Sequence, residues 1–213
     1  MKLSLTAAEK MLALFVSFTL CLLIARVVYT GSYSYMFYPW NLFLAIVPVC
    51  FSRALRRSSR INGKAILLVT GWLVFFPNAP YIITDIFHFT KRSEAPQWYD
   101  LLLVLSAAWS GLMAGFISLG YVERFLSKYC PVRWRFLLAW LFLFAASTGI
   151  YLGRYLRMNS WNVVTKPVRL AHAGLAFAFK PFNHAGAWAF CIACSIFLLL
   201  IYYSLKKTTA MHL

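Results

Sequence analysis

The stretch "WLVFFPNAPYIITDIFH", residues 72–88, decides how this chain folds. It begins as an apolar helix of the kind that crosses a membrane, meets Pro77 and Pro80, and then brings Asp85 and His88. Each proline removes a backbone donor and disfavours helical geometry at the residue before it. Irregular backbone at membrane depth is tolerated only where it is buried in protein or lines a wet cavity. We therefore expect a transmembrane helix that kinks or breaks at Pro-Asn-Ala-Pro and faces a polar interior.

The composition of the whole chain is that of an integral membrane protein. Hydrophobic residues make up 62% of it and charged residues 12%, whereas a soluble domain is about half apolar and about a quarter charged. Its 213 residues allow one bundle of about six helices, because each span takes about 20 residues. We expect an all-α bundle that forms a single polytopic domain over residues 1–213. The predicted spans are 11–29, 35–53, 61–85, 99–122, 136–155 and 187–205.

The basic charge sets the orientation of this bundle. A formal charge of +16 would suggest nucleic acid as the partner of a soluble protein. Here the Lys and Arg residues lie in short segments between apolar runs, so we expect a lipid bilayer as the partner and no nucleic acid. With six spans, 13 of the 21 Lys and Arg residues fall on one side. The excess of basic residues predicts that this side is cytoplasmic and holds both termini, N-in and C-in.

The polar residues that are costly to place in lipid fall mainly on the opposite, extracytoplasmic half. We expect this asymmetry to mark a functional pocket, because the cytoplasmic half has only basic anchors and Glu123. An ionisable side chain at membrane depth costs a few kcal/mol unless it faces protein or water. Arg26, Asp85 and Arg154 are therefore expected to turn inward and find one another. The residues of the extracytoplasmic set are Arg26, Trp40, Asn41, Asn78, Asp85, His88, Asp100, Arg154, Arg157, Asn159, Ser160, Trp161 and Asn162.

The candidate catalytic residues follow the proline break. Tyr81, Asp85 and His88 are spaced by four and three residues, so they share one face of a helix. Asp85 and His88, with Asp100 from the next span, are candidates for an acid and a base or for the ligands of a metal ion. The alternative is an ion pair between Asp85 and Arg154 that only holds the bundle together, with His88 at the headgroup level. No motif in the sequence identifies a cofactor.

The candidate binding residues include a second cluster in "GIYLGRYLRMNSW", residues 149–161. Arg154 and Arg157 share a helix face and can grip a phosphate or carboxylate group, or they anchor the helix end in headgroups. Gly149 and Gly153 allow a neighbouring helix to come close. The candidate substrate-binding residues are Asn41, Asn78, Tyr81, Arg154, Arg157, Asn159 and Trp161.

Four motifs in order resemble one family of membrane proteins. They are "PWNLFLAIVP" at 39–48, "FFPNAPYIITDIFH" at 75–88, "WYDLLLVLSAAWSGLMAGFISL" at 98–119 and "GIYLGRYLRMNSW" at 149–161. They resemble an uncharacterised bacterial family of multi-pass proteins, domain of unknown function 1361. The resemblance implies a location in the bacterial cytoplasmic (inner) membrane and brings no activity or cofactor. The family pattern has an aspartate after Asn-Ser-Trp, where this chain has Asn162.

Three functions stay open at this point. The first is a membrane enzyme that acts at the outer face on a lipid-linked or envelope substrate, or a small-ligand site in the same pocket. The second is a transporter or binding protein, which with six spans and no visible duplication would work as a homo-oligomer. The third is a non-catalytic subunit that joins a membrane partner and uses its polar cluster only to hold the bundle together.

Overall fold

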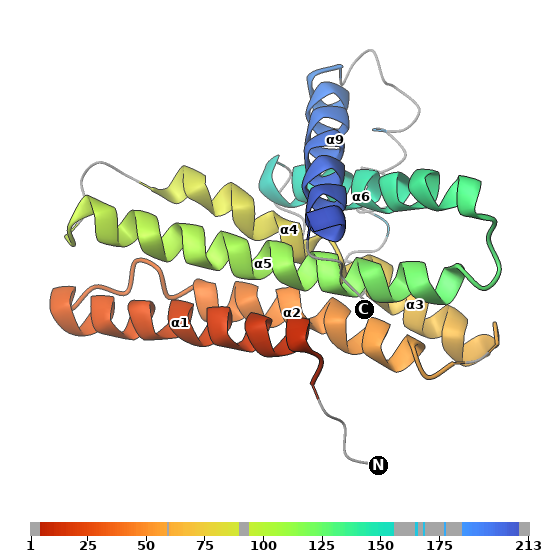
Figure 1. The fold of residues 1–213 in the computed structure, drawn as a ribbon. Helices are drawn as coiled ribbons and strands as arrows, with labels where there is room; N and C mark the ends of the chain where they lie inside the picture. Colours follow the sequence, from red (N-terminus) through yellow and green to blue (C-terminus); the bar gives the residue numbers. More distant parts are fainter. Residues whose placement is uncertain are drawn as a thin grey trace.

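The computed structural model describes residues 5–58, 60–89, 94–155, 165, 168, 177 and 185–208. Every regular secondary-structure element in this part of the chain is a helix, as predicted (Figure 1). The elements are α1 (Ala7–Thr30), α2 (Tyr38–Leu55), α3 (Gly63–Phe75), α4 (Asn78–Tyr81), the 3-10 helix η1 (Ile82–His88), α5 (Gln97–Leu126), α6 (Val132–Tyr155) and α9 (Ala185–Thr208).

The prediction of about six membrane spans is confirmed, since six helical stretches are long and apolar enough to cross a bilayer. The third of them, Gly63–Phe87, runs through α3, α4 and most of η1.

Local sequence signals fix several helix ends. Thr6 and Glu9 form a capping box at the start of α1, and Gly31 ends that helix in the left-handed region with a φ of 68°. Asn62 caps α3 by accepting a hydrogen bond from the N–H of Ala65.

The centre of the bundle is α5. In its most apolar stretch 72% of the residues are buried, against 22–44% in the other spans. Both α1 and α2 pack on α5, and Figure 1 shows them on one side of α5, with α6 beyond its other side. Nine of the 19 buried positions of α5 hold Gly, Ala or Ser, which lets neighbouring helices approach on several sides. They are Ser106, Ala107, Ala108, Ser110, Gly111, Ala114, Gly115, Ser118 and Gly120.

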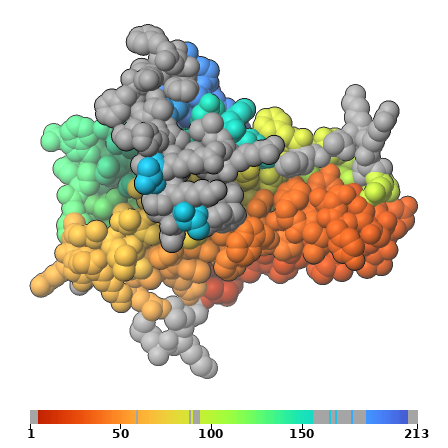
Figure 2. All heavy atoms as spheres, turned by 180° about the vertical axis from the view of Figure 1, so that it is seen from behind, coloured from red at the N-terminus to blue at the C-terminus, as the bar shows by residue number. Residues whose placement is uncertain are grey.

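The last span differs from the others in direction. Figure 1 shows α9 (blue) running steeply across the other spans, and it packs mainly on α6. On the opposite side of the molecule, α2 and α3 (orange to yellow-orange) form a broad continuous surface (Figure 2). Large apolar side chains on several spans face outward, as a bilayer environment requires. Examples are Leu14, Leu67 and Leu200, with more than 60% of each residue exposed.

The third span is interrupted at Pro77, as predicted, but the interruption is milder than a sharp break. Regular α-helical bonding ends where the N–H of Phe76 donates to the carbonyl of Trp72 at 2.7 Å. The N–H of Ala79 then bonds only three residues back, to Phe76, at 3.2 Å. The backbone nevertheless keeps right-handed helical dihedrals through Phe76 and Pro77. One α-helical bond resumes in α4, where the N–H of Tyr81 donates to the carbonyl of Pro77 at 3.1 Å. The chain thus loses hydrogen bonds at Pro77 without losing its helical course, and after α4 it continues as the tighter 3-10 helix η1.

Close packing holds the interrupted segment on two sides. A Cβ atom added at Gly149 of α6 would lie 2.5 Å from the Cβ of Pro77. A Cβ atom added at Gly111 of α5 would lie 2.5 Å from the carbonyl oxygen of Ala79. Both glycines therefore permit a backbone approach that alanine would prevent. The role predicted for Gly149 is confirmed, and the neighbour it admits is the proline segment.

The bundle has two ends, each with its own connections between helices. The connection between α1 and α2 lies at the same end as the start of α5 and the end of η1, and we call this the Asp85 end (Figure 1). The connections between α2 and α3 and between α5 and α6 lie at the opposite end, which we call the Glu123 end (Figure 1).

Candidate functional site

The first polar centre at the Asp85 end is an ion pair between η1 and α6. Arg154 Nη2 lies 2.8 Å from Asp85 Oδ1. Asn41 of α2 donates through Nδ2 to the other carboxylate oxygen of Asp85 at 3.1 Å. Arg154 also donates through Nε and Nη2 to Thr84 Oγ1, and that hydroxyl donates to the carbonyl of Tyr81. Three separate helical elements thus converge on one carboxylate.

The predicted face of the third span is confirmed for two of its three residues. The guanidinium of Arg154 lies 4.9 Å from the ring centre of Tyr81 and 5.9 Å from that of Phe87. Tyr81 and Asp85 therefore meet the same arginine, as their spacing predicts. His88 ends η1, but its side chain lies outside the described residues, so its role stays a prediction.

A second buried ion pair joins α1 and α5 at the same end. Arg26 Nε lies 2.7 Å from Asp100 Oδ1, and Arg26 Nη2 donates to Oδ2 at 3.3 Å. The two side chains are only 2% and 1% exposed. Arg26 therefore turns inward as predicted, although its carboxylate partner is Asp100. The expected single cluster of Arg26, Asp85 and Arg154 is instead two ion pairs, because α1 packs on α5.

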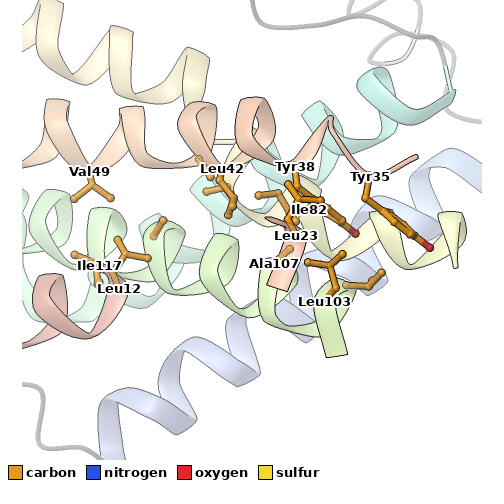
Figure 3. Close-up of a cluster of buried hydrophobic side chains, with 14 of the residues drawn as sticks. Leu12, Leu23, Tyr35, Tyr38, Leu42, Val49, Ile82, Leu103, Ala107 and Ile117 are labelled. Carbon is orange, nitrogen blue, oxygen red and sulfur yellow. The ribbon is translucent and has the colours of Figure 1, made fainter. Parts of the chain in front are cut away.

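Two tyrosines lie near both pairs. The rings of Tyr35 and Tyr38 stack with centroids 5.8 Å apart, and Arg26 lies over the Tyr35 ring at 4.6 Å. The hydroxyl of Tyr38 lies within electrostatic range of the carboxylates of both Asp85 and Asp100. In Figure 3 the two side chains extend in the same direction, with their hydroxyl oxygens at the tips. We call these two stacked rings the tyrosine layer; it contacts Arg26 and lies near the carboxylates of both ion pairs.

Two polar atoms, one in the tyrosine layer and one on the arginine beside it, are buried without a hydrogen-bond partner among the described residues. They are Tyr38 Oη and Arg26 Nη1, in residues that are 0% and 3% exposed. Buried polar groups in folded proteins are nearly always bonded to protein, water or a ligand. Neither tyrosine of the layer was predicted as a site residue, because an aromatic run at the start of a span is ordinarily an interfacial belt.

Tyr35 lies in the connection between α1 and α2, outside the spans. Burial raises the pKa of its hydroxyl above the ordinary value, and the charge of Asp100 adds to this while Arg26 opposes it. A hydrogen bond with Asp100 acts in the same direction as burial. The protonated phenol of Tyr35 is therefore part of the second ion-pair centre.

The remaining candidate residues divide into two groups. Asn78 Nδ2 donates to the carbonyl of Phe75 at 2.9 Å, so it replaces a backbone hydrogen bond lost at the proline segment. Arg157, Asn159 and Trp161 lie outside the described residues, and their binding roles stay predictions.

No group of three metal-binding side chains is found within the described ranges. Asp85 and Asp100 contact different arginines there. The arrangement of the described residues is thus that of two carboxylate–guanidinium centres.

The Glu123 end is less purely basic than the sequence led us to expect. Glu9 is 5% exposed, and its Oε1 lies 3.5 Å from Arg53 Nη1. Lys206 of α9 donates to both carboxylate oxygens of Glu123, at 2.7 and 2.8 Å. The predicted polar asymmetry between the two ends is therefore overstated, because the capping role of Glu9 brings a second buried carboxylate to this end.

Comparison with protein families gives one match. The model of the family described as "Protein of unknown function (DUF1361)" matches residues 40–201, about three quarters of the chain. This range includes Asn41, Asp85, Asp100 and Arg154, and it begins after Tyr38. The match confirms the family resemblance predicted from the four motifs. Comparisons with curated proteins and with solved structures found no match.

Proposed function

Because this chain has six candidate membrane spans and belongs to the DUF1361 family of proteins of unknown function, we propose its function from the site itself. We propose that the Asp85 end binds a small polar ligand between the two ion pairs. The observation that carries this proposal is the pair of buried atoms, Tyr38 Oη and Arg26 Nη1, that have no partner among the described residues. Such groups are costly to leave unsatisfied.

The chemistry of these two atoms indicates the class of ligand. A guanidinium nitrogen only donates hydrogen bonds, and a phenol donates one. Both therefore suit oxygen acceptors, as in a carboxylate, phosphate or carbohydrate group. Arg26 and Arg154 are each matched by an aspartate. A neutral or singly charged oxygen-rich ligand is the class that this balance favours.

The backbone hydrogen bonds lost in the interrupted helix favour a ligand-binding site over a cluster that only stabilises the bundle. An ion pair between two spans can form on uninterrupted helices, whereas here the third span gives up backbone hydrogen bonds just before Asp85. A stretch of 3-10 helix within a longer helix often marks a functional position. Both carboxylate oxygens of Asp85 already accept hydrogen bonds from Arg154 and Asn41. This observation favours the second candidate, a non-catalytic structural cluster.

We assign Asp85 the role of a carboxylate that receives or releases a proton if the ligand is a substrate, with His88 and Asp100 as the other acid–base candidates. Asn41, Asn78, Tyr81 and Arg154 stay with the binding face, as do Arg157, Asn159 and Trp161. The basic excess at the Glu123 end supports a cytoplasmic position for that end. On this basis the ligand site faces the extracytoplasmic side of a bacterial cytoplasmic membrane.

The substitution Tyr38→Phe tests the proposal. It removes an oxygen that bonds no described residue, so the melting temperature in detergent is expected to stay unchanged or to rise slightly. The same variant is expected to fail to rescue the growth or envelope defect of a strain that lacks the gene, because the ligand loses a contact. Full rescue by Tyr38→Phe would contradict the proposal.

A matched control is Tyr202→Phe. Tyr202 is also almost fully buried, but its hydroxyl donates to Glu123 Oε2. Its removal is expected to lower the melting temperature, because a charged acceptor loses a donor. The contrast separates the loss of a ligand contact from the loss of a bond within the protein.

A further inference from the structure

A separate cavity of about 190 Å³ lies at the Glu123 end, between α5, α6 and α9. Its volume is many times the ~10–15 Å³ that one water molecule needs by the same measure. Seven residues line it: Gly120, Glu123, Arg124, Ser127, Arg135, Tyr202 and Lys206. The cavity lies at the opposite end of the bundle from Asp85 and shares no residue with the two ion-pair centres there.

The charges in this cavity do not balance. Lys206 and Glu123 neutralise each other through two short hydrogen bonds. Arg124 and Arg135 have no carboxylate partner within 4 Å among the described residues. Two guanidinium groups are therefore left to give the cavity its net positive charge. Paired guanidiniums are the side chains best suited to hold a phosphate group through several hydrogen bonds.

Arg135 is only partly satisfied by the protein. Its Nη2 donates to the carbonyl of Ser127 at 3.2 Å, which fixes the direction of the side chain. Its Nε is buried and has no hydrogen-bond partner among the described residues. The Arg135 guanidinium therefore has hydrogen-bonding capacity that the described residues do not use, in an orientation that the Ser127 carbonyl fixes.

A narrow apolar crevice of about 10 Å³ adjoins the charged cavity, with room for about one water molecule. It shares Glu123, Ser127 and Arg135 with the cavity and continues between α5 and α6 along Leu119, Leu126, Leu138, Ala139 and Phe142. The crevice is too small for an acyl chain, so a lipid bound here would place only its headgroup in the cavity and keep its chains in the bilayer. Basic pockets between membrane helices bind anionic lipid headgroups.

We propose that the Glu123 end binds an anionic phospholipid, with its phosphate on Arg124 and Arg135 and its acyl chains in the bilayer beside α6, where Phe136 is 58% exposed. The phosphate is the chemistry that the arginines recognise, and the position of the cavity at the end of helices that can span a membrane favours a lipid over free phosphate. A bound lipid would join α9 to α6, because Lys206 of α9 and Arg135 of α6 both line the cavity.

The full-length protein in detergent tests this proposal through its melting temperature. Phosphatidylglycerol is expected to raise the melting temperature by about 5 °C at saturating concentration. Phosphatidylcholine at the same mole fraction, and inorganic phosphate at millimolar concentration, are expected to give less than half of that shift. An equal shift with phosphatidylcholine would overturn the requirement for an anionic head. An equal shift with inorganic phosphate would overturn the claim that the ligand is a lipid.

Variants locate the site. Arg135→Gln is expected to remove most of the shift caused by phosphatidylglycerol. Arg124→Gln, at an exposed position, is expected to weaken it and keeps the test valid if Arg135→Gln does not fold. Arg57→Gln is the matched control, since it removes the same charge from an exposed residue at the same end that does not line the cavity. Equal losses in Arg124→Gln and Arg57→Gln would overturn the proposal in favour of general surface charge.

Discussion

Gly149 of α6 lies directly against Pro77, so closely that a Cβ atom at position 149 would lie 2.5 Å from the Cβ of the proline. Real side chains essentially never come so near, and a proline ring cannot swing aside. This contact ties α6 to the segment where the third span loses its hydrogen bonds. It thereby sets the distance between Arg154, little more than one turn further along α6, and Asp85.

The substitution Gly149→Ala is therefore expected to destabilise the protein by about 1–3 kcal/mol, as overpacking in a tight interior does. Thermal melting in detergent measures the effect. Gly186→Ala is the matched control, because Gly186 is also helical and has nothing within 4 Å of the added Cβ atom. That variant is expected to be neutral or slightly stabilising, since alanine is the better helix former. Equal effects at the two positions would refute the close contact.

The ion pair between Asp85 and Arg154 is expected to be strongly coupled. Asp85→Asn or Arg154→Gln alone leaves a partner charge poorly compensated in a largely buried position, at a cost of about 3 kcal/mol. The double variant is expected to cost at least about 1 kcal/mol less than the sum of the two single variants. Unfolding in mixed detergent measures all members of the cycle.

The pair between Glu9 and Arg53 is the control for that cycle. Its atoms are 3.5 Å apart, and the Arg53 side chain is 24% exposed. The coupling there is expected to stay below about 1 kcal/mol, as for ion pairs that reach solvent. A coupling at Asp85 and Arg154 no larger than in this control would contradict the close ion pair between them.

The raised pKa of Tyr35 predicts a pH dependence of stability. The unfolded hydroxyl loses its proton at about pH 10, while the folded hydroxyl holds its proton to higher pH because of burial and Asp100. Its contribution is therefore fully present below pH 10 and is lost as the pH rises toward the folded value.

The substitution Tyr35→Phe is expected to reduce the fall in melting temperature between pH 9 and about pH 11. Tyr29→Phe serves as the control, since Tyr29 is 74% exposed at the end of α1. Equal pH profiles for wild type and Tyr35→Phe would show that the hydroxyl does not titrate with folding.

The spans and the proline interruption could be predicted because both depend on local properties. Apolar runs of about 20 residues fix the spans, and Pro77 has no N–H to donate wherever it is placed. The persistence of helical dihedrals across Pro77 was not predictable, because it depends on Gly111 and Gly149 admitting the segment from two sides. The course of α9 across the bundle likewise depends on its packing against α6.

The residues of the site were predictable as a set but not in their pairs. Burial cost alone indicates that Arg26, Asp85 and Arg154 turn inward, and Asp100 was a candidate site residue from the next span. Their pairing follows from which helices are neighbours, and a single sequence does not contain that information. Tyr38 escaped prediction for a related reason: its hydroxyl matters because of what surrounds it, and its sequence context is that of an interfacial aromatic residue.

The central claim is that a ligand binds between the two ion pairs, and an experimental map of the protein purified from its native membrane tests it most directly. We expect non-protein density within hydrogen-bonding distance of Tyr38 Oη and Arg26 Nη1. A map that resolves these side chains and shows both atoms bonded only to protein groups or water would contradict the claim. In that case the Asp85 and Asp100 centres would only hold the bundle together.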